Sequence, residues 1–294
     1  MEEDMASNDK ESDRALTDKV LASFANTPDA RLRTVMQSLV RHLHAFAGEV
    51  ELTEAEWSAA IQFLTDTGRM CDGVVRQEFI LLSDTLGVSM LVDAINHRQA
   101  KGGTDSTVFG PFYMSGMPDR AYGENMAFSP GRQAVVRGRV VSTDGEPVAG
   151  AILDVWQTAD NGMYSGQDTA QPYGNLRGRY RTDAEGRYAI RTIVPVSYPI
   201  PTDGPVGRML EATARHPWRP AHLHFMIDAP GHRTLVTHLF DEDDPYLDSD
   251  AVFGVKPSLK VAYRERPADD ALARAFGFDG PFREANYDFV LERG

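Results

Sequence analysis

The first hundred residues of the chain carry apolar side chains at the spacing of α-helices. One stripe, with intervals of three and four residues, predicts a helix from near Pro28 to near Gly48; its members are Leu32, Met36, Leu39, Leu43 and Phe46. Thr53 and Glu56 form a capping box that opens a second helix. A third helix is expected to start near Val75 and to continue through Phe79, Leu82, Leu86 and Met90.

Apolar stripes of this width need a surface to pack against. A unit of about four helices covers its own core poorly, so we expect a homodimer through this region. The residues that precede the helices, 1–14, are polar and have no apolar period, which indicates a disordered lead.

The pattern changes after residue 104, where Gly, Pro and β-branched residues punctuate short apolar runs. These runs predict strands at residues 134–142, 151–157, 187–194, 223–227, 234–240 and 287–291. Short strands with regular turns indicate an antiparallel β-sandwich, and the absence of β-α-β alternation argues against a parallel barrel or a doubly wound sheet. We therefore predict an α+β chain with a lead (1–14), a helical dimerisation or lid domain (15–104) and a β-sandwich domain (105–294).

Composition and charge narrow the classes of partner. The chain has 294 residues, a formal net charge of −13 and a single cysteine, Cys71. The negative charge argues against nucleic acid, and one cysteine allows no internal disulfide, which fits a reducing cytoplasm. The N-terminus is acidic where a secretory signal would be basic, and no apolar run approaches the ~20 residues of a membrane span. We expect a cytoplasmic protein without a membrane span.

Candidate chemistry centres on His222 and His224, which are separated by one residue in a predicted strand. Side chains alternate in a strand, so both imidazoles point to one face while Leu223 and Phe225 pack on the other. The pair is either half of a metal site or two unrelated polar positions on a half-exposed strand.

Two tyrosines, Tyr164 and Tyr198, follow turn-like segments upstream of the histidines. Taken singly, each is more often structural than a ligand. If both joined the two histidines, the resulting set of hard phenolate and borderline imidazole donors would suit an oxidised ion, with ferric iron the obvious candidate. A cupin-type ferrous site fits less well, because Asp228 is the only nearby carboxylate.

These residues lie in segments that resemble the intradiol catechol dioxygenases. The resemblance runs through Asp154-Val155-Trp156-Gln157, Asp160 to Tyr164, Arg177-Gly178-Arg179-Tyr180, Ser197 to Pro201 and Arg219 to His224. It implies a non-haem Fe(III) held by Tyr164, Tyr198, His222 and His224, in a β-sandwich that acts on aromatic diols with O2. It also implies that Tyr198 leaves the metal and acts as a base, and that Arg219 stabilises negative charge developing on the substrate. Members of the family are dimers that hold a phospholipid-like molecule between their helical domains, so a lipid is among the expected partners.

Two further segments, Arg76 to Asp84 and Asp244 to Phe253, are similar to the branch of the family that acts on hydroxyquinol. The expected reaction is cleavage of benzene-1,2,4-triol to 3-hydroxy-cis,cis-muconate, the enol form of maleylacetate. The resemblance implies a set of residues that surround the substrate ring, and most of them are apolar, as a flat aromatic ligand requires. These predicted substrate residues are Leu81, Asp84, Val108, Gly110, Pro111, Phe112, Ile200, Pro201, Arg219 and Val252. Asp84 and Arg219 are the charged exceptions, and Asp84 is either a hydrogen-bond acceptor for the third hydroxyl or an ordinary carboxylate on a helix surface.

One residue departs from the family pattern. Many catechol enzymes of the family have glutamine where this chain has His238, which is therefore either a catalytic hydrogen-bonding residue or an ordinary strand histidine. Two alternatives stay open: a catechol or chlorocatechol 1,2-cleaving enzyme, and a transthyretin-like binding module whose histidines hold a structural metal such as zinc.

Overall fold

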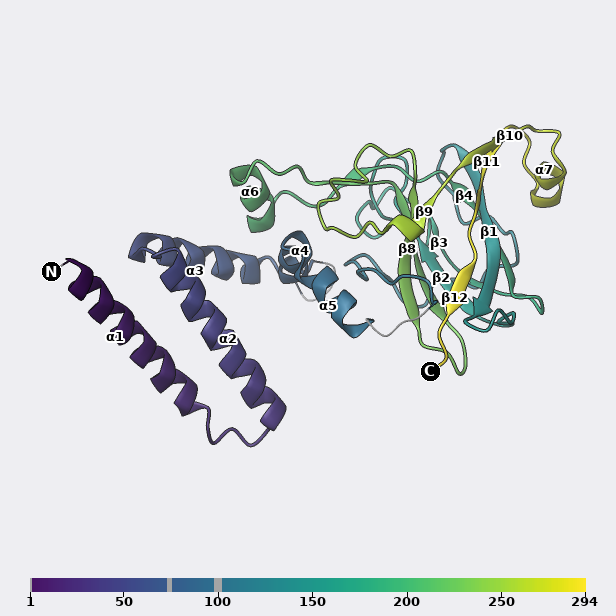
Figure 1. The fold of residues 1–294 in the computed structure, drawn as a ribbon. Coiled ribbons are helices and arrows are strands. Elements are labelled where there is room, and N and C mark those ends of the chain that lie inside the picture. Colours follow the sequence, from purple (N-terminus) through teal and green to yellow (C-terminus); the bar gives the residue numbers. More distant parts are fainter. Residues whose placement is uncertain (1, 73–75, 98–101) are drawn as a thin grey trace. The chain divides into compact units, whose positions relative to one another are not determined.

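The computed structural model describes residues 2–72, 76–97 and 102–294. It forms two compact units, Met1–Thr65 and Asp66–Gly294 (Figure 1). The first unit contains α1 (Glu2–Ser23) and α2 (Ala30–Glu49), and α3 (Glu54–Arg69) begins in it. Helices α4 and α5, which the sequence analysis assigned to the helical domain, belong to the second unit.

The structure places the residues of the expected disordered lead in helix α1, which begins at Glu2. No glycine or proline interrupts the chain before Pro28, and Glu, Lys, Ala and Met are strong helix formers. Adding a residue to an existing helix costs little compared with nucleating one, so the helix extends through residues that lack an apolar period.

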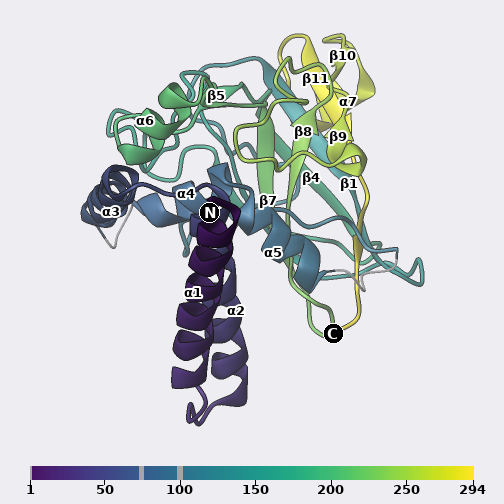
Figure 2. The same ribbon diagram turned by 60° about the vertical axis from the view of Figure 1, so that its left-hand side comes forward.

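The first two predicted helices are confirmed as α2 and α3, and both have capped N-termini. In α2, the Asp29 carboxylate accepts the Leu32 N–H at 2.9 Å. In α3, the Thr53 N–H donates to Glu56 Oε2 at 2.9 Å and the Glu56 N–H to Thr53 Oγ1 at 3.3 Å, so the capping box forms. Helices α1 and α2 lie side by side, as both ribbon views show (Figure 2).

The third predicted helix is two helices, α4 (Glu78–Thr85) and α5 (Val88–Asn96). They are separated by Gly87, whose φ of +72° is left-handed and ends a helical run. Its predicted start near Val75 lies outside the described residues. The second unit also has α6 (Pro205–Ala212), α7 (Ala271–Phe276) and a 3₁₀ turn, η1 (Pro257–Leu259). Helix α6 lies between the strands predicted at residues 187–194 and 223–227.

Two five-stranded sheets form the sandwich of the second unit. The first sheet has the order β3-β2-β7-β8-β9, formed by β3 (Arg177–Arg181), β2 (Ile152–Trp156), β7 (His222–Asp228), β8 (Leu235–Asp241) and β9 (Lys260–Val261). The second has the order β10-β11-β1-β12 with β4 also paired to β1, formed by β10 (Arg264–Arg266), β11 (Phe282–Asn286), β1 (Gln133–Ser142), β12 (Phe289–Leu291) and β4 (Arg187–Ile193). A small ladder joins β5 (Tyr198–Pro199) to β6 (Trp218–Arg219).

The sandwich is mixed and not purely antiparallel as predicted. Strands β11 and β12 both run parallel to β1, and β9 runs parallel to β8. The chain steps from β11 to β12 beside Gly138, where an added Cβ would lie 1.8 Å from the Tyr287 carbonyl oxygen. Glycine at 138 therefore permits the close approach on which this parallel edge depends.

The core between the sheets confirms the predicted alternation of β7. Leu223, Phe225 and Ile227 are buried in the main hydrophobic cluster, together with Val136 and Phe289 of the opposite sheet. The histidines of β7 therefore face away from this core, on the outer face of the first sheet.

Candidate metal centre

Four side chains from neighbouring strands lie in a row across the first sheet, and the row includes the candidate ligand His224. Arg177 of β3 pairs with Trp156 of β2, Trp156 pairs with His224 of β7, and His224 pairs with His238 of β8. Directly paired residues share a face, so these four point to the same side. All are buried, and the Trp156 indole stacks on the His224 ring with centroids 4.7 Å apart and planes at 14°.

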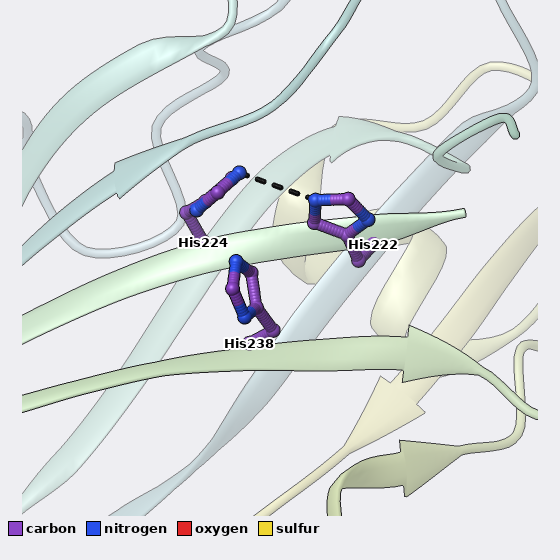
Figure 3. Close-up of side chains that lie close together, drawn as sticks. All are labelled: His222, His224 and His238. Atoms are coloured by element: carbon purple, nitrogen blue, oxygen red, sulfur yellow. Dashed lines mark hydrogen bonds between the residues drawn. The ribbon is translucent and has the colours of Figure 1, made fainter. Parts of the chain in front are cut away.

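His222 and His224 converge as the strand period requires. Their Nε2 atoms lie 3.1 Å apart (Figure 3). His222 Nδ1 lies 2.6 Å from the Pro220 carbonyl oxygen, and because a carbonyl only accepts, Nδ1 carries the proton. Its Nε2 is then an unprotonated lone-pair donor directed at the cluster, which is the form a metal ligand needs.

Both tyrosines meet the histidines. The Tyr164 hydroxyl lies 2.8 Å from His224 Nε2 and 3.0 Å from the Tyr198 hydroxyl. Gly162 permits this approach: its φ is +77°, and an added Cβ would lie 3.2 Å from the Cβ of Tyr198. Four donor atoms from three separate segments therefore form one continuous cluster, and all four residues are at most 4% exposed.

Arg219 lies beside the cluster in a buried ion pair. Its Nη1 is 3.5 Å from the Tyr198 hydroxyl and 3.2 Å from His222 Nε2, and its Nε donates to Asp250 Oδ1 at 3.1 Å. Burial lowers the pKa of Arg219, but the Asp250 charge outweighs burial and raises it, so the guanidinium stays charged. The pair is not a surface ion pair, because both side chains are at most 4% exposed.

His238 also belongs to the cluster. Its Nδ1 contacts Thr107 Oγ1, its Nε2 has no hydrogen-bond partner, and its ring centroid lies 4.1 Å from that of His224. Candidate ligand atoms of His222, His224 and His238 lie within 4.8 Å of one another. Three buried imidazoles whose nitrogens lie this close together could hold a metal ion, because imidazole is a common ligand of transition metals.

The electrostatics of the cluster favour neutral imidazoles and a neutral Tyr164 phenol when no cation is present. Burial, followed by the neighbouring positive charges, lowers the pKa of His222, His224 and His238 well below the ordinary value. Burial, and next the Tyr198 hydroxyl, raises the pKa of Tyr164 well above its ordinary value. Only a strongly Lewis-acidic ion would remove a proton from such a phenol, so the donor set fits an oxidised cation.

A cavity of about 290 Å³ opens beside the cluster. Four of the predicted substrate residues line it: Leu81, Pro111, Phe112 and Pro201. Phe112 stacks on the Tyr164 ring with centroids 4.7 Å apart, which connects the cavity to the donor cluster. Arg76 and Asp203 form an ion pair of 2.9 Å among the lining residues.

The other predicted substrate residues lie elsewhere around the cluster. An added Cβ on Gly110 would be 3.1 Å from the His224 ring, and Val108 is buried one residue after Thr107. Val252 donates its N–H to Asp250, and Ile200 is buried two residues after Tyr198. None of these four lines the 290 Å³ cavity.

Asp84 is not the helix-surface carboxylate considered as its ordinary role, because it is 3% exposed. Burial raises its pKa, while a hydrogen bond from Ser89 and the charge of Arg219 partly offset that effect. It also does not line the cavity. No role was predicted for Trp156, Asp250 or Arg177, although each lies in a segment that carries the family resemblance. The positions of Trp156 and Arg177 depend on strand register, and Asp250 comes to Arg219 from a distant loop.

Family models match almost the whole chain. The model described as "Catechol dioxygenase N terminus" matches residues 29–104, and the model described as "Dioxygenase" matches residues 108–293. The second match alone covers more than half of the chain and includes every residue of the donor cluster.

Individual relatives agree with the family models. The 6-chlorohydroxyquinol 1,2-dioxygenase of Cupriavidus pinatubonensis is 56% identical over 277 residues, which is 94% of this chain and 96% of the relative. The crystal structure of hydroxyquinol 1,2-dioxygenase from Pseudomonas putida DLL-E4 is 65% identical with a TM-score of 0.92, covering 97% of this chain and 100% of that one. Catechol 1,2-dioxygenase from Pseudomonas arvilla C-1 is 34% identical with a TM-score of 0.81, covering 95% and 91%. The chain belongs to the intradiol ring-cleavage dioxygenase family.

Proposed function

We propose that the chain is an Fe(III)-dependent dioxygenase that cleaves hydroxyquinol with O2 to 3-hydroxy-cis,cis-muconate, the enol form of maleylacetate. The observation that supports this proposal most strongly is the cluster of two phenol oxygens and two imidazole nitrogens, in which neighbouring donor atoms lie 2.8–3.1 Å apart. The metal ligands in this proposal are Tyr164, Tyr198, His222 and His224. Bound Fe(III) would supply the Lewis acidity that deprotonates the phenols and binds a catecholic oxygen pair.

The residues around the metal have separate tasks in this proposal. Tyr198 accepts a proton from the incoming diol, and Arg219, 3.5 Å from its hydroxyl, stabilises negative charge on the substrate. Asp250 holds the guanidinium in place and keeps the buried pair neutral. His238 directs an unpartnered Nε2 toward the cluster, where it would hydrogen-bond with the reacting groups.

We assign hydroxyquinol as the substrate, and not catechol or chlorocatechol, because the more similar relatives are named for hydroxyquinol. Of the relatives described above, the two named for hydroxyquinol or its chloro derivative are 56% and 65% identical, and the catechol 1,2-dioxygenase from Pseudomonas arvilla C-1 is 34% identical. We assign the preference for the third hydroxyl to Asp84, whose charge interacts with that of Arg219. The direct test is O2 consumption with hydroxyquinol, catechol and 4-chlorocatechol, with the ring-opened product identified by mass spectrometry. The proposal fails if hydroxyquinol is not opened between its adjacent hydroxylated carbons.

Asp84→Asn tests the substrate assignment separately, because it keeps the shape of the side chain and removes its charge. We expect kcat/KM for hydroxyquinol to fall by about 10-fold or more, with a smaller change for catechol, since a hydrogen bond to a charged group contributes about 1.5–3 kcal/mol. An unchanged ratio of the two kcat/KM values would show that Asp84 does not determine the preference for hydroxyquinol, and it would leave the assignment of the metal ligands unaffected.

The assembly that this function would use is a homodimer through the first unit. Large apolar side chains on α2 and α3 are exposed, including Leu32, Leu39, Leu43, Phe46, Trp57 and Ile61. A second copy of the chain offers the same stripe and would cover it symmetrically. A phospholipid acyl chain suits the same surface, and extraction of purified protein with organic solvent followed by mass spectrometry would detect it.

We also propose a cytoplasmic location, because the single cysteine, Cys71, allows no internal disulfide and therefore fits a reducing compartment. Among the residues that the structure describes, no helix has both the length and the apolar character needed to cross a membrane. Fractionation of cells that express the chain would test the location.

A further inference from the structure

The carboxylate of Asp244 joins the two segments that carry Tyr198 and His222. Its Oδ2 accepts a hydrogen bond from the Ser197 hydroxyl, and the same atom accepts the Ala221 N–H at 2.9 Å. Ser197 directly precedes Tyr198, and Ala221 directly precedes His222. The residues before two of the four proposed ligands are therefore bound to one carboxylate oxygen of a third segment.

Asp244 is itself held in place by the turn that follows β8. Its Oδ1 accepts the Tyr246 N–H at 2.8 Å, and its own N–H donates to the Asp241 carbonyl oxygen at 3.2 Å. The Asp241 N–H donates to the Ala221 carbonyl oxygen at 3.0 Å, so this turn binds both backbone groups of Ala221. A polar network whose members all have partners is rigid, so the turn can hold Ser197 and Ala221 at a defined separation.

A short ladder also joins the two segments, but it stops before His222. Strands β5 and β6 pair over two residues each, and β6 ends at Arg219. The next residue, Pro220, has no N–H with which to continue the ladder. The bridge through Asp244 therefore extends the connection to the residue next to the proposed ligand.

The contacts of Asp244 indicate a role in position and not in charge pairing. The three groups bound to its carboxylate are one hydroxyl and two backbone N–H groups, which are all neutral. The side chain is partly buried, and it does not line the 290 Å³ cavity beside the donor cluster. Its hydrogen bonds therefore act on the backbone of the ligand segments and not on a molecule in that cavity.

We infer that Asp244 is a positioning residue that sets the separation of Tyr198 and His222 in the metal site. This inference deepens the proposed function and rests on it, since the separation matters only if both residues are ligands. Groups that orient metal ligands in this way typically contribute about 10- to 100-fold to metal affinity or activity.

The test compares how fast iron leaves the resting enzyme, without substrate, when an iron chelator is added. We expect Asp244→Asn and Ser197→Ala each to lose iron about 10-fold faster than the parent, because each change breaks the bridge. The asparagine cannot replace the carboxylate fully, since its amide nitrogen donates and does not accept. Ser197→Thr keeps the hydroxyl and should lose iron at nearly the parent rate. The double variant Ser197→Ala/Asp244→Asn should be at most about twice as fast as Asp244→Asn alone, because both changes break one hydrogen bond.

Asp183→Asn is the matched control. The Oδ1 of Asp183 also accepts two backbone N–H groups of a turn, those of Glu185 and Arg187, but that turn joins β3 to β4 and carries no proposed ligand. Iron loss from this variant should equal that from the parent. Steady-state kinetics add a second comparison: in Asp244→Asn, kcat for hydroxyquinol should fall by about 10-fold while KM changes less, because Asp244 does not line the cavity.

Iron loss at the parent rate from Ser197→Ala would overturn the inference, whatever Asp244→Asn does. This variant removes only a hydroxyl, so it decides the question even if Asp244→Asn fails to fold. Equally fast iron loss from Asp183→Asn would also overturn the inference, because it would show a general loosening of the sandwich. A parent protein that binds no iron would instead overturn the proposed function, and the inference with it.

Discussion

The two units of the chain differ in how far their large apolar side chains are buried. Helix α2 has no buried residue, and Leu43 and Trp57 of the first unit are 54% and 59% exposed. In the β-sandwich, Leu223, Phe225 and Leu239 are completely buried between the two sheets. The sandwich therefore supplies its own packing, while the helices leave a surface that another molecule must cover.

The same contrast applies to polar groups. The sandwich buries arginine, aspartate, histidine and tyrosine side chains together, which is stabilising only if each group has a partner. In the helical unit the capping box of Thr53 and Glu56 is exposed to solvent. Substitutions in the first unit should thus change association, whereas substitutions in the sandwich should change metal binding and stability.

The largest effect is expected for His222→Ala. It removes a proposed iron ligand, so we expect iron content to fall below about a tenth of the parent value and activity to fall by about 10³-fold or more. His232→Ala is the matched control, since the Nδ1 of His232 also contacts the carbonyl oxygen of a proline two residues earlier, but this histidine is only partly buried and is not among the candidate ligands. Elemental analysis of both proteins checks the prediction, and equal iron in the two would contradict it.

Asp250→Ala should be the next most severe change. It leaves the Arg219 charge buried without a counter-ion, which costs about 3 kcal/mol or more of unfolding free energy. Asp144→Ala breaks the exposed ion pair with Arg293 and should cost less than about 1 kcal/mol. Urea titrations of the two variants at neutral pH make the comparison, and similar losses would show that burial of the Arg219 pair has no special energetic role.

Leu43→Asp should change the assembly and leave the folded chain intact. Because Leu43 is 54% exposed, the change opens no cavity, but it places a charge in the apolar surface that we propose a second copy covers. Sedimentation should show a dimer for the parent and a monomer for the variant at micromolar concentration. The control is Tyr173→Asp, at a 75% exposed aromatic of the second unit, which should stay dimeric. A monomeric parent would exclude the dimer directly.

The smallest effect concerns Glu284, which joins β1 to β10 through Arg137 at 2.6 Å and Arg266 at 2.5 Å. Burial raises the pKa of Glu284, but hydrogen bonds from Asn286 and the two arginines outweigh burial and lower it. A carboxylate with a lowered pKa contributes stability above its unfolded pKa of about 4.3, and this stability is lost as the pH falls through the folded value. Glu284→Gln should therefore cost about 2 kcal/mol at pH 7 and nearly nothing near pH 2. A loss independent of pH would point to packing as its cause.

Periodicity predicted the parts of the fold that depend on local sequence. The apolar stripe of α2 and the alternation of Leu223, Phe225 and Ile227 in β7 could both be read directly. The parallel pairing of β11 and β12 with β1 could not, because it joins residues about 150 positions apart and has no local signal. Gly87 shows a third case: the apolar stripe continues across it, but one left-handed residue divides the helix.

For the site, the sequence identified which residues are involved and left their arrangement open. The H-x-H spacing predicted that His222 and His224 converge, and the structure brings Tyr164 and Tyr198 to them. The positions of Arg177 and His238 beside His224 follow from the pairing of four strands, which no local pattern specifies. Asp84 shows the same limit, since an amphipathic helix pattern could not tell that this carboxylate is buried.

The most direct test of the account is to record the visible absorption and the metal content of one concentrated sample of the purified chain. The account predicts about one iron per chain and a broad tyrosinate-to-Fe(III) band, which makes the solution wine-red. Hydroxyquinol added without O2 should change that band. A colourless protein that contains zinc would contradict the account, and the cluster of His222, His224 and His238 would then be a three-imidazole zinc site in which the tyrosines are not ligands.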